Sequence, residues 1–423
     1  MEQLREKAII VGVQLQNQTD FPSSMEELRN LAAACQIEVI GQLEQKANRI
    51  NSSLYIGSGK MQELKKLLEQ TNASVVIFNE ELTPSQIRNI EGSIDRRVID
   101  RTILILDIFA TRAQTKEAQL QVEIARLQYM LPRLVGLRES LGRQGGGGGS
   151  GLKNRGSGET KLELDRRRIE DRISALQADL DKMVARRQVQ RKQRQKNEVP
   201  VVCLVGYTNT GKSSLMNVMI DKYNPVLGKQ VLAQDMLFAT LETSVRSIEL
   251  PDRKTFLLTD TVGFVSQLPH HLIKAFRSTL EEVTEADLLV HVVDFSNPEY
   301  ERLIEVTTET LKALGADHIP TLYAYNKLDL TEYKYPRIDG NNVYLSARNN
   351  SGIDELTGLI SQRIFNDYVE CELLIPFDKG GWVSYFNERA HVQSMSHEYE
   401  GTLLKLTCRT ADYDKYQSES VTG

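Results

Sequence analysis

The 423-residue sequence lacks any apolar run of the roughly 20 residues that a membrane-spanning helix needs. Its N-terminal stretch, MEQLREKAIIVGVQLQ, has only a short apolar run interrupted by glycine and polar residues, unlike a secretory signal. Cysteine is scarce, and the four cysteines are too far apart for a zinc site or a secreted disulfide framework. We therefore expect a soluble cytoplasmic protein with buried, reduced thiols and no membrane contact.

A strong charge of either sign is also missing. The net charge is -5 and the pI is about 5.9, which gives no overall attraction to nucleic acid or to anionic membrane. Apolar residues make up 40% and charged residues 26% of the chain, which excludes a wholly disordered or fibrous protein. Because the net charge is small, any site for a polyanion has to be local. The length predicts about three compact units.

Residues 1–112 alternate short apolar runs such as AIIVGVQL with helical stretches such as SMEELRNLAAAC, which predicts an N-terminal α/β domain. Ser58, Gly59 and Lys60 resemble the end of a phosphate-binding loop. The preceding glycine stands only two positions before Gly59, so the preferred interpretation is a helix start, with nucleotide binding as the less favoured alternative.

Residues 113–197 predict two amphipathic helices, because apolar residues recur every three or four positions. The two apolar seams are Leu120, Ile124, Leu127, Leu131 and Leu134, and Ile169, Ile173, Leu176, Leu180 and Met183. An antiparallel hairpin would remove both seams from water, with Pro132 kinking or ending the first helix and a glycine-rich tip at about 143–159. The basic run at 186–196 is either a solvated helix end or a phosphate-contacting stripe.

A third domain is expected at 198–368, and a small α+β appendage at 369–423. The stretch GYTNTGKS, from Gly206 to Ser213, follows an apolar strand and precedes a helix, which is the setting of a P-loop. Its backbone N–H groups and the helix N-terminus would surround phosphate oxygens. Lys212 would bridge the β- and γ-phosphates, and the Ser213 hydroxyl would bind Mg²⁺.

Three further motifs specify the nucleotide. Asp260-Thr-Val-Gly263 would place a carboxylate near Mg²⁺ and a glycine N–H near the γ-phosphate, the plain alternative being an ordinary strand-to-loop aspartate. In the motif NKLD that begins at Asn326, Asp329 can accept two hydrogen bonds from guanine, and an unpaired carboxylate against adenine would cost about 1–3 kcal/mol. Ser346-Ala-Arg resembles the last guanine-contact loop of G proteins. The fold class predicted is α/β, with a P-loop GTPase domain whose mostly parallel sheet lies between helices.

Residues 231–242, VLAQDMLFATLE, fall where the first switch belongs, and Thr240 is the preferred hydroxyl to complete the Mg²⁺ shell, ahead of Thr243 or a plain loop role. Phe264 stands where many G proteins carry a water-orienting glutamine. It is either a packing residue or the sign of slow intrinsic hydrolysis that a partner stimulates. Asn209 resembles the asparagine of potassium-stimulated G proteins, which suggests a K⁺ site.

The predicted site therefore has three groups of residues. The catalytic residues are Lys212, Thr240 and Gly263, and the Mg²⁺ ligands are Ser213 and Thr240. The nucleotide-binding residues are Gly206, Tyr207, Thr208, Asn209, Thr210, Gly211, Lys212, Ser213, Ser214, Phe238, Ala239, Thr240, Leu241, Glu242, Asp260, Thr261, Val262, Gly263, Asn326, Lys327, Leu328, Asp329, Ser346, Ala347 and Arg348.

The chain resembles the HflX family of ribosome-associated GTPases. The resemblance is carried by VIDRTILILDIFATRAQTKEAQLQVEIARLQYMLPRL, RGSGETKLELDRRRI, GYTNTGKSSLMN, ADLLVHVVD and DMLFATLE, and it weakens beyond about Val369. It implies that the N-terminal part and hairpin reach into the 50S subunit near the peptidyl-transferase centre, and that the GTP-bound protein splits or rescues stalled ribosomes. The implied partners are 50S rRNA, GTP and GDP, for a monomer that is cytoplasmic and partly ribosome-bound.

The hairpin tip suits that role, because Arg143, Lys153 and Arg155 would neutralise rRNA phosphates while the glycines allow close approach. A flexible connector is the alternative for Gly145 to Gly149. The tip departs from the family pattern at Ser157, where members usually carry proline. Two other functions stay open on sequence alone: an ATP- or GTP-dependent RNA-remodelling factor, and a passive scaffold.

Overall fold

The computed structural model describes residues 6–16, 18, 20–144, 155–196, 199–223, 238, 244–266, 272 and 282–417, with the side chains of 134–144, 155–162, 186–196 and 417 excepted. The chain forms two compact units. The first comprises Met1–Lys192, Gln234–Glu242 and Val262–Thr279, and the second comprises Gln193–Ala233, Thr243–Thr261 and Leu280–Gly423. The polypeptide therefore passes from the second unit to the first between Thr261 and Val262.

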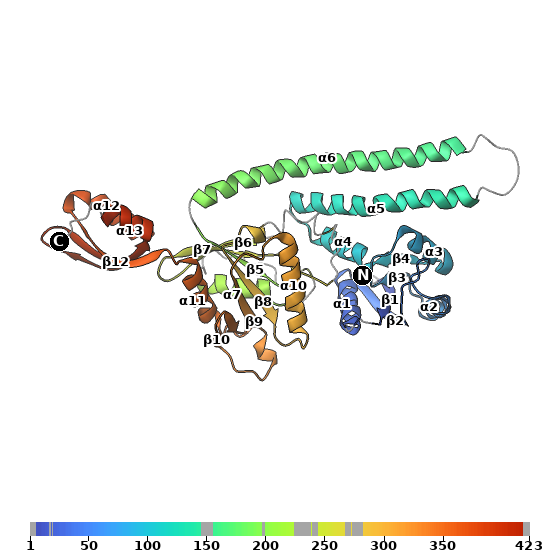
Figure 1. The fold of residues 1–423 in the computed structure, drawn as a ribbon, viewed down its shortest axis with the longest axis horizontal. Helices are drawn as coiled ribbons and strands as arrows, with labels where there is room; N and C mark the ends of the chain where they lie inside the picture. Colours follow the sequence, from blue (N-terminus) through green and yellow to red (C-terminus); the bar gives the residue numbers. More distant parts are fainter. Residues whose placement is uncertain are drawn as a thin grey trace, which may run out of the picture. The chain divides into compact units, whose positions relative to one another are not determined.

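The first unit is built on a four-stranded parallel sheet in the order β2-β1-β3-β4 (Figure 1). Strand β1 is a continuous apolar run whose successive side chains point to opposite faces of the sheet, and helices bury both faces: α1 and α4 cover one, and α2 and α3 the other. Helix α2 begins at Ser58, so the predicted helix start there is confirmed. The elements are β1 (Glu6–Leu15), α1 (Phe21–Ala34), β2 (Ile37–Ala47), α2 (Ser58–Thr71), β3 (Val75–Phe78), α3 (Pro84–Ile94), β4 (Arg97–Asp100) and α4 (Arg101–Arg112).

The long hairpin, as far as Lys192, also belongs to the first unit. Its helices are α5 (Lys116–Gln144) and α6 (Arg155–Lys196), which lie side by side and antiparallel (Figure 1). The predicted seams meet: Leu120 and Ile124 of α5 form a buried cluster with Leu176 and Leu180 of α6. Helix α5 continues through Pro132, so this proline does not end it.

The ends of the hairpin differ from the expected tip. Because α5 reaches Gln144 and α6 begins at Arg155, both ends of the range 143–159 are helical, Ser157 included. Gly145 to Gly149 and Lys153 lie outside the described residues, as do the side chains of Arg143 and Arg155.

The second unit holds a seven-stranded sheet in the order β10-β11-β9-β8-β5-β7-β6. Its inner pairs are parallel, and only the outer strands β10 and β6 pair antiparallel, so the predicted fold class is confirmed. The elements are β5 (Val201–Val205), α7 (Lys212–Tyr223), β6 (Ser244–Glu249), β7 (Thr255–Asp260), β8 (Leu288–Asp294), α10 (Tyr300–Leu314), β9 (Thr321–Asn326), a 3₁₀ turn (Leu328–Leu330), β10 (Arg337–Asp339), β11 (Asn342–Tyr344) and α11 (Ile353–Ile364).

A small antiparallel sheet in the order β12-β14-β13 ends the second unit, with α12 and α13 packed on it. Its elements are β12 (Tyr368–Ile375), a 3₁₀ turn (Phe377–Lys379), α12 (Gly380–Arg389), β13 (His391–His397), β14 (Thr402–Arg409) and α13 (Thr410–Gln417). The four cysteines are free thiols: Cys203 and Cys408 are buried, whereas Cys35 and Cys371 are partly exposed.

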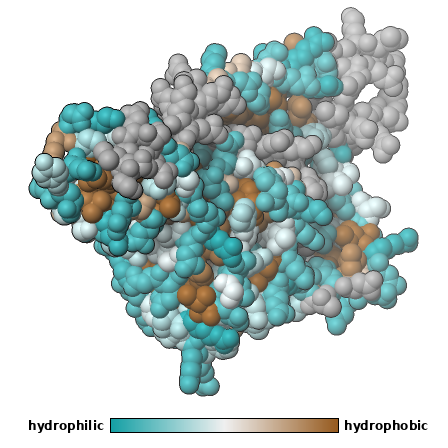
Figure 2. Space-filling view, turned by 60° about the vertical axis from the view of Figure 1, so that its left-hand side comes forward, coloured by the Kyte–Doolittle hydropathy of each residue, from teal (hydrophilic) through white to brown (hydrophobic). Residues whose placement is uncertain are grey.

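On the face drawn in Figure 2 most residues are hydrophilic, and hydrophobic residues form separate small patches. None of the helices in the described part of the chain combines the length and the apolarity that crossing a bilayer demands.

Candidate nucleotide site

The phosphate loop joins the end of β5 to the start of α7, at the carboxyl edge of the parallel strands. Two glycines make its tight wrap possible. Gly206 has φ +142° and a Cβ there would lie 2.3 Å from the Val292 carbonyl oxygen, while Gly211 has φ +93° and a Cβ would lie 2.4 Å from Asn326 Nδ2. A side chain at either position would collide with β8 or with the Asn326 amide, so the loop needs glycine at both.

Lys212 is buried at the first position of α7, with an exposed fraction of 6%. Its Nζ donates to the carbonyl oxygens of Gly206 (3.0 Å) and Tyr207 (2.6 Å), so the ammonium lies within the curve of the loop. Burial lowers the pKa of Lys212 to about 8, and the charge of Asp260 opposes that shift. The cation is therefore held by neutral carbonyls, which leaves it ready to pair with an anion.

Behind the loop, His291 of β8 stays neutral. Burial and the charge of Lys212 lower the pKa of His291 to about 3. A histidine here is not a titrating group at physiological pH.

Ser213 and Asp260 form a pair of hard oxygen donors at the N-terminus of α7. The Ser213 hydroxyl donates to Asp260 Oδ2 at 2.6 Å, and Asp260 is fully buried at the end of β7. Thr261 fixes the chain beyond, because its hydroxyl donates to the Leu204 carbonyl oxygen at 2.7 Å. In the described residues no group of three or more His, Cys, Asp or Glu side chains gathers to hold a metal ion. The donor set fits Mg²⁺, which takes few protein ligands and completes its shell with water and phosphate oxygens.

Asn326 connects the phosphate loop to the base-reading loop. Its Nδ2 donates to the Thr210 carbonyl oxygen at 2.9 Å, and its Oδ1 accepts the Ala347 N–H at 2.9 Å. The side chain is buried, so these two bonds are the means by which both backbone groups are satisfied away from water.

The carboxylate of Asp329 is oriented by its neighbour. The Ser346 hydroxyl donates to Asp329 Oδ1 at 2.6 Å, and the Asn349 N–H donates to the same hydroxyl at 3.2 Å. Among the described residues no hydrogen bond reaches Oδ2 of the half-buried Asp329, so the carboxylate can still accept from a ligand. The motif residues 326, 329, 346 and 347, far apart in sequence, therefore lie together.

One partner in this region was not foreseen from the sequence. Lys327 adopts a left-handed conformation with φ +65°, and its Nζ pairs with Asp294 Oδ2 at 2.8 Å. Asp294 ends β8, so the signal that could have found it is an aspartate at the carboxyl end of an apolar strand, as at Asp260.

The first-switch residues are only partly accounted for. Ala239, Thr240, Leu241, Glu242 and Thr243 lie outside the described residues. Phe238 is buried in the first unit, where its ring packs edge-on against Phe109 with centroids 4.7 Å apart.

The segment after Asp260 also enters the first unit. Val262 and Val265 join its apolar core, and Gly263 and Phe264 are buried. The burial of Phe264 favours the packing interpretation of that residue. Asn209 is exposed and has φ +61°, a left-handed position that asparagine tolerates.

Comparison with known proteins agrees with this architecture. Three family models match consecutive stretches: the GTP-binding GTPase N-terminal region at 22–110, the GTP-binding GTPase middle region at 112–194 and the 50S ribosome-binding GTPase at 201–327. The chain is 44% identical to a GTPase HflX of Caldanaerobacter subterraneus subsp. tengcongensis, with 96% of this chain and 93% of the relative covered. It is 37% identical to the GTPase HflX of Escherichia coli, with 94% and 92% covered.

A solved GTP-binding protein from Sulfolobus solfataricus in complex with GDP is also similar, at 24% identity and a TM-score of 0.43, with 85% of this chain and 98% of that chain covered. The identities to the curated relatives extend over nearly the whole chain, from the α/β domain through the hairpin to the phosphate loop. The chain belongs to the HflX family of GTPases.

Proposed function

We propose that the site described above binds GTP with Mg²⁺ and hydrolyses it to GDP and phosphate, and that docking on the 50S ribosomal subunit accelerates this reaction. The observation that carries the proposal is the buried amide of Asn326, which joins the phosphate loop at Thr210 to the base loop at Ala347. One side chain thus sets the spacing between the triphosphate tail and the purine.

In this proposal the phosphates take the place of carbonyl oxygens around Lys212. The backbone N–H groups of 206–213 surround the β-phosphate, and the lysine exchanges its bonds to Gly206 and Tyr207 for charged oxygens. Mg²⁺, when bound, would be held by the hydroxyls of Ser213 and Thr240 with the Asp260 carboxylate near it, and it would neutralise charge on the phosphates.

Guanine recognition rests on Asp329. Its carboxylate accepts from the guanine N1–H and N2–H₂ groups, while Ser346, Ala347 and Arg348 lie at the loop that borders the base. Adenine offers no such donor pair, and the carboxylate would be left unpaired against it. GTP is therefore preferred over ATP.

Hydrolysis is slow without a partner in this proposal. Phe264, which follows Gly263, is a buried packing residue, and whatever its packing role its side chain has no group that could orient water. A donor supplied from outside at the transition state raises turnover by about 10³–10⁵ in other GTPases.

Asn209 would hold K⁺ between the phosphates. Comparing GTP turnover in KCl with turnover in NaCl tests this, since equal rates would remove K⁺ from the mechanism.

The ribosome supplies the partner. The matched G-domain model is that of a 50S ribosome-binding GTPase, and the hairpin α5–α6 offers a long, narrow shape suited to RNA-lined cavities. We propose that the hairpin approaches rRNA near the peptidyl-transferase centre, and that the GTP-bound monomer splits or rescues stalled ribosomes in the cytoplasm.

The test is hydrolysis of GTP and of ATP by the full chain, each with and without purified 50S and 70S particles. We expect guanine preference and at least tenfold stimulation by 50S, both abolished in Lys212→Ala. Equal use of the two triphosphates would refute the role of Asp329. An unchanged rate with ribosomes would remove the ribosomal role and leave the GTPase.

A further inference from the structure

The backbone of Ser266 is hydrogen-bonded on both sides by charged residues of the first unit, the buried Arg101 and the partly buried Glu27. The guanidinium of Arg101 donates to the Ser266 carbonyl oxygen at 2.9 Å, and Oε1 of Glu27 accepts the Ser266 N–H at 3.4 Å. Arg101 and Glu27 also pair with each other. Ser266 stands three residues after Gly263, so these hydrogen bonds fix the chain that leaves the nucleotide site.

Arg101 is buried and is held in place by further hydrogen bonds. Arg101 has an exposed fraction of 2%, and its other terminal nitrogen donates to Asn79 Oδ1 at 3.2 Å. Asn79 in turn donates to the Ser24 hydroxyl at 2.9 Å. Burying an ion pair is seldom favourable for stability alone, and loss of one partner leaves an uncompensated charge. Such a network specifies one position of the chain at 266.

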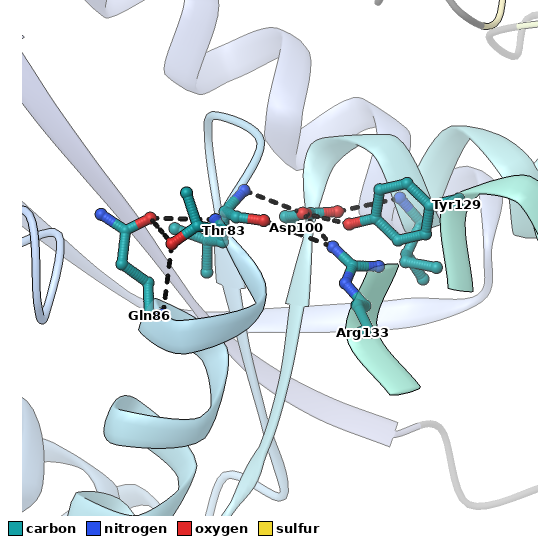
Figure 3. Close-up of polar contacts among 7 residues, drawn as sticks. Thr83, Gln86, Asp100, Tyr129 and Arg133 are labelled. Atoms are coloured by element: carbon teal, nitrogen blue, oxygen red, sulfur yellow. Dashed lines mark hydrogen bonds and ion pairs between the residues drawn. The ribbon is translucent and has the colours of Figure 1, made fainter. Parts of the chain in front are cut away.

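The residue before Arg101 holds the hairpin. Asp100 is fully buried and accepts hydrogen bonds from the backbone N–H groups of Leu82 (2.9 Å) and Ile103 (3.0 Å). Two α5 side chains bind the same carboxylate: Arg133 at 3.0 Å and the hydroxyl of Tyr129 (Figure 3).

Tyr129 and Arg133 form one surface of α5. They stand one helical turn apart, and the Arg133 guanidinium stacks over the Tyr129 ring at 3.3 Å from its centroid. Burial raises the pKa of the Asp100 carboxyl, and its hydrogen bonds together with the Arg133 charge oppose that rise. The buried carboxylate is thus compensated by the N–H groups of Leu82 and Ile103 and by Arg133 of α5.

Two consecutive residues therefore join two parts of the molecule that the proposed function requires to respond to each other. We propose that Asp100 and Arg101 couple the segment Val262–Ser266 to helix α5. The nucleotide state then alters how α5 packs on Asp100, and contacts made by the hairpin alter the rate of GTP hydrolysis. Adjacent Cα atoms are only about 3.8 Å apart, so a shift at Arg101 moves Asp100 with it. The second half of this proposal rests on the proposed ribosomal function.

A first experiment needs no ribosome. Hydrogen–deuterium exchange of the full chain is compared between GDP and a non-hydrolysable GTP analogue, in the wild type and in Arg101→Lys. Lysine keeps the charge beside Glu27 but cannot also reach Ser266 and Asn79 in the fork geometry of arginine. We expect the nucleotide to change uptake at Thr261–Ser266 and at Tyr129–Arg133, with the second change lost in Arg101→Lys. A response at Thr261–Ser266 without one in α5, or no response at either, would overturn the coupling.

A second experiment uses 50S particles. Arg133→Met removes the charge that binds Asp100, and Arg172→Met is its matched control, because Arg172 pairs with Glu123 between α5 and α6 at an exposed position. We expect Arg133→Met to bind 50S and to keep basal hydrolysis, but to lose stimulation by about fivefold or more, within the usual range of allosteric coupling. Arg172→Met should behave as wild type.

The two ways of failing are distinct. Stimulation that survives in Arg133→Met refutes the coupling while the proposed function stands. A wild type that 50S does not stimulate refutes the proposed function, and the exchange experiment then decides the coupling alone. Tyr129→Phe removes only the hydroxyl and keeps the ring under Arg133, so it provides a folded second variant if Arg133→Met unfolds.

Discussion

Removing the amide of Asn326 should lower the free energy of unfolding more than removing a residue that only recognises the base. Asn326 is 3% exposed, and it satisfies the Thr210 carbonyl and the Ala347 N–H. Asn326→Ala leaves one buried acceptor and one buried donor without that partner. Each such loss costs about 1–3 kcal/mol, so the nucleotide-free chain should lose about 2–6 kcal/mol.

Asp329→Ala provides the contrast. Asp329 is only half-buried, and in the described chain its removal leaves one buried donor, the Ser346 hydroxyl, without its acceptor, against two buried groups for Asn326. This variant should keep most of its stability and lose guanine preference. Asn326→Ala should instead weaken GTP, GDP and ATP together, because it loosens the phosphate loop and the base loop from each other.

The assay is urea unfolding of both nucleotide-free variants, with hydrogen–deuterium exchange at Val201–Tyr223 as the local measurement. Asn326→Ala should raise exchange in the phosphate loop, and Asp329→Ala should not. If Asn326→Ala unfolds like the wild type and loses only discrimination between purines, the bracing role inferred from its two bonds is wrong.

Three further outcomes are expected. The pKa of Lys212 is lowered to about 8, so the free protein loses this charge at higher pH, whereas the phosphate-bound lysine keeps it. Above pH 8, GTP binding should therefore take up a proton, and GTP affinity should fall by up to about tenfold per pH unit. Calorimetry in two buffers measures both effects. Gly211→Ala, whose Cβ would lie 2.4 Å from the Asn326 amide, should lose GTP affinity by about tenfold or more in the same calorimeter. Leu176→Ala, in the closed hairpin seam, should cost about 2–5 kcal/mol in thermal or urea unfolding, whereas Leu164→Ala, 52% exposed, should cost little; equal losses would contradict the seam.

Local patterns made the sheet and the nucleotide motifs predictable. The phosphate loop, Asp260, Asn326 and Asp329 each follow an apolar run, and parallel strands bring their carboxyl ends to one edge. The hairpin was also predictable from a local pattern, because apolar residues spaced three and four positions apart fix which face of a helix is apolar. Its tip was not, since Arg155 begins a helix where glycine and serine predicted a loop.

The hydrogen bonds of Arg101 and Glu27 to the Ser266 backbone could not be predicted. Arg101 and Ser266 are 165 positions apart, and nothing periodic marks either residue. A buried arginine in an apolar stretch such as VIDRTILILDIF gives no sign of which backbone it will satisfy, because its partner is set by tertiary packing. The same holds for Asp100, whose N-cap role for α4 is readable locally, whereas its bonds to Tyr129 and Arg133 are not.

The placement of Asp260 shows why these unpredictable contacts matter for the predictable site. Its carboxylate meets Ser213 at the carboxyl edge of the seven-stranded sheet, yet Val262, two residues later, lies in the apolar core of the other unit. A segment so short cannot absorb a shift of Asp260 without moving its next residues, and Ser266 is held at both its N–H and its carbonyl. In the proposed coupling, a change at the γ-phosphate would therefore be transmitted along this short segment to Arg101 and to its neighbour Asp100.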